Sequence, residues 1–308
     1  MPSISRLRHR TTKAERKQAR RNVHLNRLPA NTVRRYDVAL RLFFVWFTEV
    51  SMLINNVFEL DDAVGRYIVN LWQEGDTIGL AGDTLSGLQY RLKFLKKCLC
   101  GSWSLIGKWR AKELPNRAPP LPLSVVLALA GGFLQIGEVG MAAGVLLSFH
   151  CFLRAMETFT LQSCDIHLAK GRGIVNLRST KKGCRDIVTI DDPLVVAVLL
   201  LAKRRLKRND LLIPHSPQRC RVLFHEMLTL LGVIDLGFKW HSFRRGGATN
   251  HFQSYGRMDL TLHRGRWEHS RTAKIYIADG LLASEEMSFT KEQLKSLSTA
   301  ASYLSVFD

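Results

Sequence analysis

A cationic and a titratable side chain lie close together near the middle of the C-terminal half of the chain. Residues 240–249 read Trp-His-Ser-Phe-Arg-Arg-Gly-Gly-Ala-Thr, which puts His241 and Arg244 three residues apart. On a helix, such a pair projects from one face. A guanidinium can hold two phosphate oxygens at once, and an imidazole can donate or exchange a proton. The pair could therefore bind a phosphate and move a proton, although a solvated helix face carries the same residue types.

A second segment downstream adds a tyrosine at a defined spacing. Residues 265–277 read Gly-Arg-Trp-Glu-His-Ser-Arg-Thr-Ala-Lys-Ile-Tyr-Ile, so Trp267 and Tyr276 are nine residues apart. Together the two segments resemble the tyrosine recombinase (phage integrase) family. That family pairs a His-x-x-Arg segment, often followed by Ala-Thr, with a His or Trp nine residues before a nucleophilic Tyr. The Phe-Arg-Arg-Gly-Gly-Ala-Thr and Gly-Arg-Trp spellings are most similar to recombinases of eukaryotic mobile elements.

The resemblance implies two earlier landmarks, and the sequence contains both in the expected order. Arg154 follows an apolar segment and has Glu157 three residues after it. Lys181 lies in Thr-Lys-Lys-Gly between two β-prone runs, with Lys182 as an alternative. The match covers roughly residues 121–279, and Phe152 departs from it because a Gly is common at that position.

The resemblance also implies a role for each residue. Arg154 and Arg244 would neutralise the charge that develops on the non-bridging oxygens of a scissile phosphate. Tyr276 would attack the phosphorus and form a covalent 3′-phosphotyrosyl link that keeps the bond energy for rejoining.

The other members of the site would move protons or orient groups. His241 would assist proton transfer or orient an oxygen, and Lys181 would protonate the leaving 5′-oxygen. Trp267 would orient and pack, since an indole can only donate a hydrogen bond. This scheme requires no metal and no nucleotide cofactor.

Each residue also has a purely structural interpretation. Arg154 could serve only to pair with Glu157, and Lys181 could be an exposed charge on a hairpin. Trp267 could be a core aromatic residue, and Tyr276 a surface tyrosine. Tyr255 and Tyr303 are poorer candidates for the nucleophile because neither has the nine-residue spacing to Trp267.

The composition points to a polyanionic partner. Lys and Arg number 45 against 26 Asp and Glu, which gives a formal net charge of +19. Binding of such a chain to nucleic acid releases condensed counterions. Charge therefore favours nucleic acid, and the resemblance implies double-stranded DNA as the partner, with self-association on the DNA. A solvated basic surface or attraction to anionic lipid are the alternatives that charge alone leaves open.

Cysteine usage and hydropathy narrow the class further. The six cysteines include no Cys-x-x-Cys pair. We therefore expect reduced, buried thiols and no metal site. The apolar stretch 121–153 is interrupted by glycines and polar residues, so its pieces fall short of the ~20 residues that span a bilayer. The expected location is intracellular, and nuclear in a eukaryote.

The elements that must position these residues fall into four segments. Residues 1–28 form a basic arm, and the helical periodicity of residues 29–110 predicts a helical domain. By its class and position, the resemblance implies that this domain is a core-binding-like DNA-binding domain. Residues 111–122 are a Pro-rich linker. Residues 123–308 form the recombinase catalytic domain with a C-terminal tail. The fold class expected is mainly α with a small antiparallel β-sheet (α+β).

Several boundaries follow from local signals. Asp83-Thr84 can cap a helix, and Val139 to Phe159 reads as one helix. The runs 173–177 and 187–190 predict a hairpin. Gly280 can end the helix that carries Tyr276. Thr290 and Gln293 form a capping box, and the apolar tail behind it is expected to pack on a surface. The resemblance implies that this surface belongs to a neighbouring protomer, with its own domain as the alternative.

The function expected is that of a site-specific recombinase or integrase. A catalytically inactive or domesticated DNA-binding protein of the same fold is one alternative. A type IB topoisomerase-like relaxase is the other.

Overall fold

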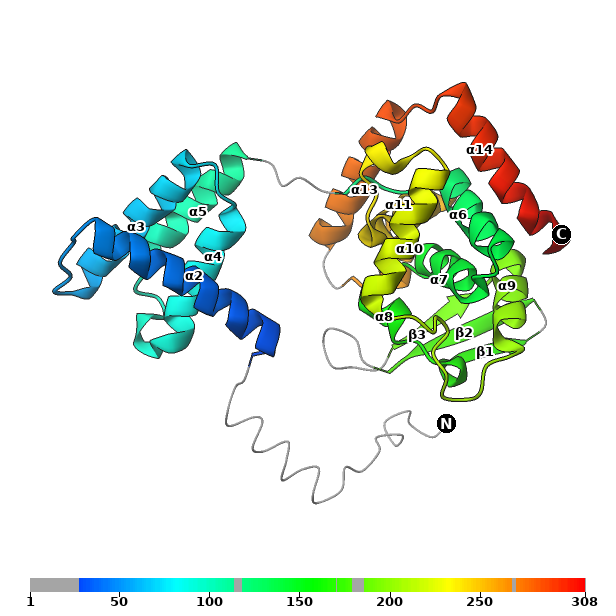
Figure 1. The fold of residues 1–308 in the computed structure, drawn as a ribbon, viewed down its shortest axis with the longest axis horizontal. Coiled ribbons are helices and arrows are strands. Elements are labelled where there is room, and N and C mark those ends of the chain that lie inside the picture. Colours follow the sequence, from blue (N-terminus) through cyan, green and yellow to red (C-terminus); the bar gives the residue numbers. More distant parts are fainter. Residues whose placement is uncertain (1–27, 114–117, 170, 179–185, 268–269, 308) are drawn as a thin grey trace, which may run out of the picture. The chain divides into compact units, whose positions relative to one another are not determined.

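The structure, a computed structural model, describes residues 28–113, 118–169, 171–178, 186–267 and 270–307. It does not describe the side chains of residues 271, 272, 275, 276, 279 and 285. The chain divides into two compact units, Met1–Asn116 (unit 1) and Arg117–Asp308 (unit 2), as Figure 1 shows. The expected basic arm, apart from its last residue, and Lys181 with Lys182 lie outside the described residues.

The described part of unit 1 is helical, as its periodicity predicted. Its elements are α2 (Ala30–Glu49), α3 (Val57–Gln73), α4 (Ile78–Arg91), the 3-10 helix η2 (Lys93–Leu95) and α5 (Cys100–Lys112). Helix α2 packs on α4, and α3 packs on α5. The core between them includes Phe43, Tyr67, Leu85 and Ile106.

Polar side chains fix the ends of these helices. The Asn56 side chain accepts the backbone N–H of Glu59 at the start of α3. Asp61, on α3, accepts the N–H groups of Gly101 and Ser102 at 2.8 and 2.9 Å, which caps α5. The expected cap at Asp83 is wrong: α4 begins five residues earlier, and Asp83 instead forms an ion pair with Arg35 of α2 at 2.7 Å.

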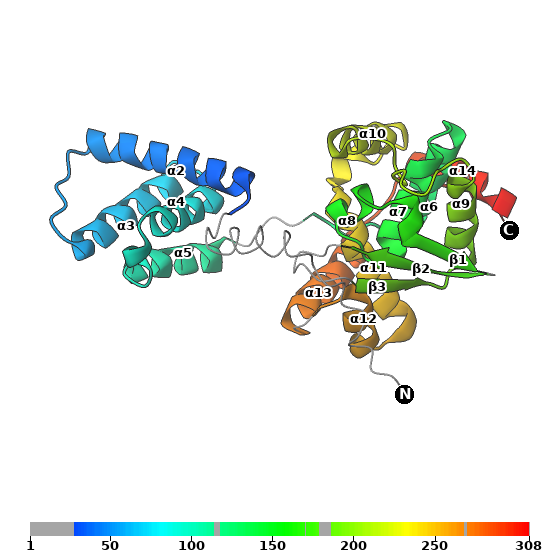
Figure 2. The same ribbon diagram turned by 90° about the horizontal axis from the view of Figure 1, so that it is seen from below.

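Unit 2 combines helices with one small sheet (Figure 2). Its first elements are α6 (Leu123–Gln135), α7 (Val139–His150), α8 (Ala155–Phe159), η3 (Ser163–Asp165), β1 (Ile166–Ala169), β2 (Arg172–Leu177) and β3 (Asp186–Ile190). Those that follow are α9 (Pro193–Lys203), α10 (Pro217–Leu230), η4 (Ile234–Leu236), α11 (Trp240–Tyr255), α12 (Met258–Gly265), α13 (Ser270–Glu286), α14 (Lys291–Ala301) and η5 (Ser302–Phe307).

The sheet confirms the hairpin prediction. Strands β1, β2 and β3 are antiparallel in that order, with Val175 opposite Ile166 on one side and Val188 on the other. Side chains alternate between the two faces of a strand. Val175 and Val188 accordingly enter the core, whereas Ile174 and Ile187 are exposed.

The apolar stretch 121–153 forms two helices at the centre of unit 2. Helices α6 and α7 pack on each other, and most of their residues are buried. None of the helices in the described ranges is long and apolar enough to cross a membrane. The expected single helix from Val139 to Phe159 is wrong, because the chain leaves α7 after His150 and turns at Phe152, whose φ is 48°.

The C-terminal segment packs on its own unit. Helix α14 lies along α6 (Figure 1), and Leu297, Ala300 and Leu304 are buried in the same core as α6 and α7. The capping box is confirmed: the Gln293 N–H donates to Thr290 Oγ1 at 3.2 Å, and the Thr290 N–H donates to Gln293 Oε1 at 2.9 Å. The expectation that this tail packs on a neighbouring protomer is therefore wrong for this structure.

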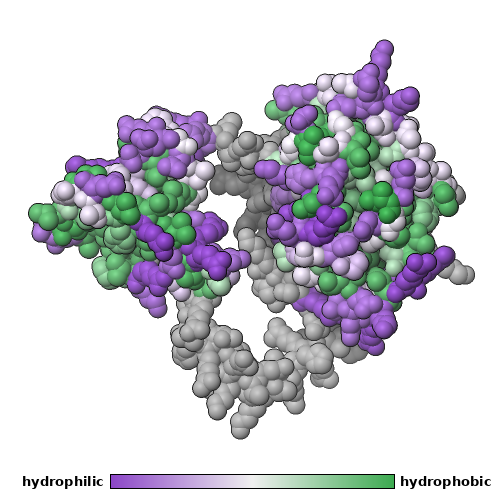
Figure 3. All heavy atoms as spheres, viewed as in Figure 1, coloured by the Kyte–Doolittle hydropathy of each residue, from purple (hydrophilic) through white to green (hydrophobic). Residues whose placement is uncertain are grey.

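The cysteines differ in part from expectation. Cys151 and Cys220 are buried, and burial raises the pKa of Cys151 to about 12. Cys98 and Cys100, however, are exposed. Figure 3 shows apolar side chains among the hydrophilic ones on the surface of unit 1. Exposed apolar residues of this unit include Val45, Leu53 and Phe58.

Candidate active site

Helix α11 carries His241 and Arg244 and is held tightly in unit 2. Trp240 packs against Phe159 and Phe224, with ring centroids 4.5 and 5.7 Å apart. A Cβ on Gly246 would lie 2.0 Å from the Leu121 carbonyl oxygen, and one on Gly247 would lie 2.1 Å from that of Phe149. Only glycine permits this approach. The glycine pair after Arg244 thus fixes the first half of α11 against α7 and the chain before α6.

Arg244 is a buried guanidinium with a fixed orientation. Its side chain is among the largest that are fully buried, with 2% of the residue exposed. Nη1 donates to the Phe152 carbonyl oxygen, and Nη2 donates to that of Gly265 at 2.6 Å. The guanidinium carbon lies 4.7 Å from the centre of the Trp267 ring, a cation–π contact. Two carbonyls and one indole therefore hold Arg244 in place.

His241 lies in the first turn of the same helix, at the surface. Partial desolvation of its ring, together with the positive charges of Arg244, Arg245 and Arg154, lowers the pKa of His241 below its ordinary value of 6.5. A cation disfavours a second positive charge nearby. The imidazole is therefore neutral at pH 7, and one of its nitrogens can accept a proton.

Arg154 comes from a different part of the chain, immediately before α8. Its Nη1 donates to Glu157 Oε1 at 2.7 Å, and its backbone N–H donates to Glu157 Oε2 at 2.8 Å. The Glu157 side chain is 4% exposed, whereas that of Arg154 is 33% exposed. Arg154 thus pairs with Glu157, as its structural interpretation requires, and still presents part of its guanidinium to solvent.

The end of α12 and the turn that follows it contribute two arginines that the sequence interpretation did not select. Arg266 has a φ of 55° and a side chain that is 9% exposed. Its Nη2 donates to Glu157 Oε2 at 2.8 Å. Desolvation lowers the pKa of Arg266, against the opposite effects of Glu157 and Asp186. The Gly-Arg-Trp string was the available signal, but the sequence interpretation assigned a role only to its tryptophan.

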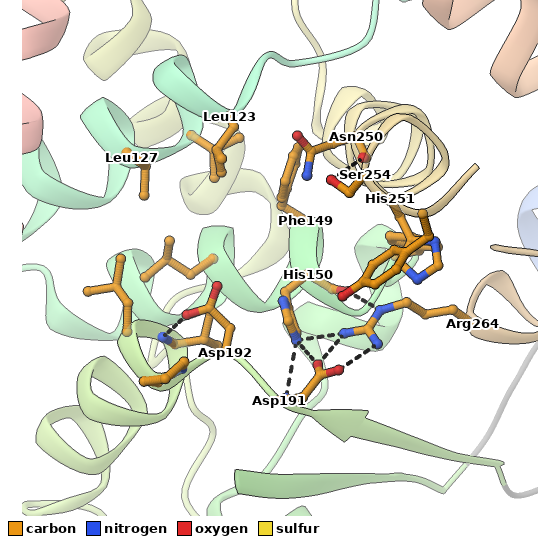
Figure 4. Close-up of a pocket in the computed structure, with 18 residues that line it drawn as sticks. Leu123, Leu127, Phe149, His150, Asp191, Asp192, Asn250, His251, Ser254 and Arg264 are labelled. Carbon is orange, nitrogen blue, oxygen red and sulfur yellow. Dashed lines mark hydrogen bonds and ion pairs between the residues drawn. The ribbon is translucent and has the colours of Figure 1, made fainter. Parts of the chain in front are cut away.

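Arg264, two residues earlier in α12, connects the end of this helix to the end of α7. Its Nε donates to the His150 carbonyl oxygen at 2.8 Å, and its Nη2 pairs with Asp191 Oδ1 at 2.9 Å. Figure 4 shows these groups along one wall of a cavity of about 330 Å³, whose other side is formed by apolar residues such as Leu123 and Leu127. The described lining includes Phe152 but none of the catalytic candidates.

Helix α13 carries Tyr276 and packs on α11. Ala273 and Ile277 are buried, and a Cβ on Gly280 would lie 2.0 Å from Thr249 Oγ1 of α11. The expectation that Gly280 ends the helix is therefore wrong. This glycine lies inside α13, which continues to Glu286 and requires a small residue where the two helices cross. The side chain of Tyr276 is outside the described residues.

The structure therefore brings together four of the six candidate residues. Arg154 and Arg244 both act on the pKa of His241, and Trp267 lies on Arg244. They come from the turn before α8, from α11 and from the turn after α12. Among the described residues, no group of three or more His, Cys, Asp or Glu could hold a metal ion.

Comparison with known proteins identifies the fold. No protein-family model and no curated protein matches the sequence. Solved structures do match, and they show that the chain has the fold of the tyrosine recombinases. This confirms the α+β fold class that the sequence predicted, as well as the resemblance at the level of fold.

Three of these structures illustrate the likeness. An XerH site-specific recombinase in a post-cleavage complex with a palindromic difH substrate is 17% identical, with a TM-score of 0.55, over 82% of this chain and 78% of that one. A lambda integrase dimer bound to a COC′ core site is 12% identical, with a TM-score of 0.59, over 92% and 99%. The Tn1549 transposon integrase in complex with transposon right end DNA is 12% identical, with a TM-score of 0.59, over 87% and 96%.

Proposed function

We propose that this protein is a site-specific DNA recombinase or integrase that cleaves and rejoins double-stranded DNA. One observation supports this proposal most: within a tyrosine recombinase fold, side chains from three separate segments lie together, namely Arg154, His241, Arg244 and Trp267. Tyr276 is the nucleophile in this proposal. Its helix packs on α11, which carries two of the four residues.

The proposed reaction needs only side chains of this chain. The Tyr276 oxygen attacks the scissile phosphorus, and the bond to the 5′-oxygen breaks. Arg154 and Arg244 stabilise the negative charge that develops on the non-bridging oxygens. Neutral His241 accepts or relays the tyrosine proton, and Lys181 donates a proton to the 5′-oxygen. Rejoining is the reverse, with a 5′-hydroxyl attacking the phosphotyrosine and releasing Tyr276.

The partners in this proposal are DNA and further copies of the chain. A net charge of +19 favours binding to a polyanion. Each of the three recombinase structures above is a DNA complex, and the lambda integrase is a dimer on its site. We propose an intracellular location, which is the nucleus if the host is a eukaryote.

The test is covalent capture on a suicide duplex, whose nicked strand loses the 5′-hydroxyl needed for rejoining. The full chain should form a protein–DNA adduct that survives denaturation. Tyr276→Phe should bind the duplex and form no adduct, whereas Tyr255→Phe, a change at an exposed tyrosine, should form it normally. Binding without any adduct would favour the inactive DNA-binding protein. An adduct with relaxation of supercoils but without strand exchange between duplexes would favour the relaxase.

A further inference from the structure

The backbone at Arg266 is in a conformation that arginine rarely adopts. Its φ of 55° lies in the left-handed region, which a non-glycine residue enters at a cost. The residue before it is the glycine of this turn, and a Cβ there would collide with the Trp267 ring at 2.0 Å. Gly265 therefore makes room for the Trp267 ring, and the strained left-handed backbone falls on Arg266, the next residue. Such strain persists only where the surrounding contacts hold the residue in place.

The contacts of its guanidinium are few for a group so deeply buried. Nη2 donates to Glu157 Oε2 at 2.8 Å and to the Phe152 carbonyl oxygen at 3.3 Å. Nε lies 3.7 Å from Asp186 Oδ2, at the start of β3. Neither Nε nor Nη1 has a hydrogen-bond partner in the described part of the chain. A residue needed only for stability would be expected to satisfy its buried donors better.

The acceptor of Arg266 is the carboxylate that also holds Arg154. Glu157 Oε1 accepts from Arg154 Nη1 at 2.7 Å, and Oε2 accepts from both the Arg154 backbone N–H and Arg266. Without Arg266, one oxygen of Glu157 would lose its charged donor, and the carboxylate could rotate together with Arg154. With Arg266 present, both carboxylate oxygens of Glu157 are held in place, and the exposed part of the Arg154 guanidinium has one preferred direction.

We propose that Arg266 is a positioning residue for the phosphate-binding site: through Glu157 it fixes the guanidinium of Arg154. The inference rests on the proposed function of Arg154. The same short turn orients the second arginine as well, because Gly265 accepts from Arg244 and Trp267 lies on it. Residues 265–267 thereby orient both Arg154 and Arg244, and they lie in the segment that leads into α13.

The experiment measures single-turnover cleavage of a suicide duplex, duplex affinity and thermal unfolding for the full chain and its variants. Arg266→Gln removes the guanidinium. Arg264→Gln is the matched control, because it removes an ion-paired arginine of similar burial at the end of α12, two residues before Arg266, without touching Glu157. Arg266→Gly is the second variant, since glycine suits the left-handed backbone and keeps the turn if Arg266→Gln fails to fold.

Both Arg266 variants should cleave about 10²-fold more slowly, as expected when a catalytic group is misplaced by about 1 Å. Their duplex affinity should stay close to that of the unchanged chain. Arg264→Gln should lower the melting temperature with a much smaller effect on cleavage. In an Arg154→Lys background, Arg266→Gln should add little, because residues that act through one another are not additive. Slow variants remain measurable because the suicide duplex accumulates adduct over hours.

Three outcomes would overturn the role of Arg266. The first is an equal loss of cleavage in Arg264→Gln and the Arg266 variants, and the second is no loss of cleavage in the Arg266 variants. The third is an Arg266 effect that is as large in the Arg154→Lys background as in the unchanged chain. Failure of the proposed function itself gives a different result, since the unchanged chain would then form no adduct at all.

Discussion

The position of α14 on its own unit can be tested by shortening one buried side chain. Leu297 is 3% exposed and lies in the core shared with α6. The two helices approach each other closely, because a Cβ on Gly131 of α6 would lie 1.9 Å from the Ala300 carbonyl oxygen. Leu297→Ala removes a buried isobutyl group, which typically costs about 2–5 kcal/mol. Leu294→Ala, on the exposed side of the same helix, is the matched control.

The size of unit 2 converts this cost into a melting temperature. The unit has 308 − 117 + 1 = 192 residues, and a domain of that size loses about 2–4 °C per kcal/mol. Leu297→Ala should therefore lower the melting temperature of unit 2 by about 4–20 °C. Leu294→Ala should change stability by no more than about 0.5 kcal/mol, or about 1–2 °C.

Thermal unfolding followed by circular dichroism at several protein concentrations is the assay. The melting temperature should not depend on concentration if α14 packs within its own chain. Equal effects of Leu297→Ala and Leu294→Ala would show that α14 does not lie on α6 in solution. A melting temperature that rises with concentration would show that the helix is exchanged between copies.

Three further predictions concern the site. Gly280→Ala should lower the free energy of unfolding by about 1–3 kcal/mol through overpacking, and it should also slow adduct formation. Adding Thr249→Ala should restore part of both the stability and the rate, and no recovery in the double variant would refute the contact between α11 and α13. Because the pKa of His241 is held below 6.5, the rate of adduct formation should fall only below that pH. Arg154→Gln removes a cation that lowers this pKa, so it should move the acid limb of the rate–pH profile to higher pH. An unmoved limb would contradict the proximity of Arg154 to His241. Arg244→Ala should slow cleavage by about 10²–10³-fold with a much smaller loss of duplex affinity, and equal losses would argue against a catalytic role.

The sequence predicted those elements whose signals are local. The capping box at Thr290 and Gln293 and the hairpin of residues 173–177 and 187–190 both follow from patterns a few residues long. The family motif predicted that Arg154, His241, Arg244 and Trp267 would lie together, because such a motif records spacings that a fold sets. The nine-residue spacing from Trp267 to Tyr276 is information of the same kind.

Other features depend on contacts between distant segments, and local signals misled there. Gly280 reads as a helix end, yet it is required by Thr249 some thirty residues earlier in the chain. Phe152 and Arg266 adopt left-handed backbones that their residue types give no reason to expect. The tail was assigned to a neighbouring protomer on the family resemblance alone, since its apolar residues do not reveal which surface they cover. In the structure that surface is α6 of the same chain.

The central claim is that Tyr276 forms a covalent bond to the 3′-phosphate of cleaved DNA. The most direct measurement is mass spectrometry of the digested adduct from a suicide duplex, which identifies the peptide and the residue that carry the nucleotide remnant. The account predicts a single modified site at Tyr276 with a 3′-phosphate linkage. An adduct mapped to another residue, or cleaved DNA without any attached peptide, would contradict it.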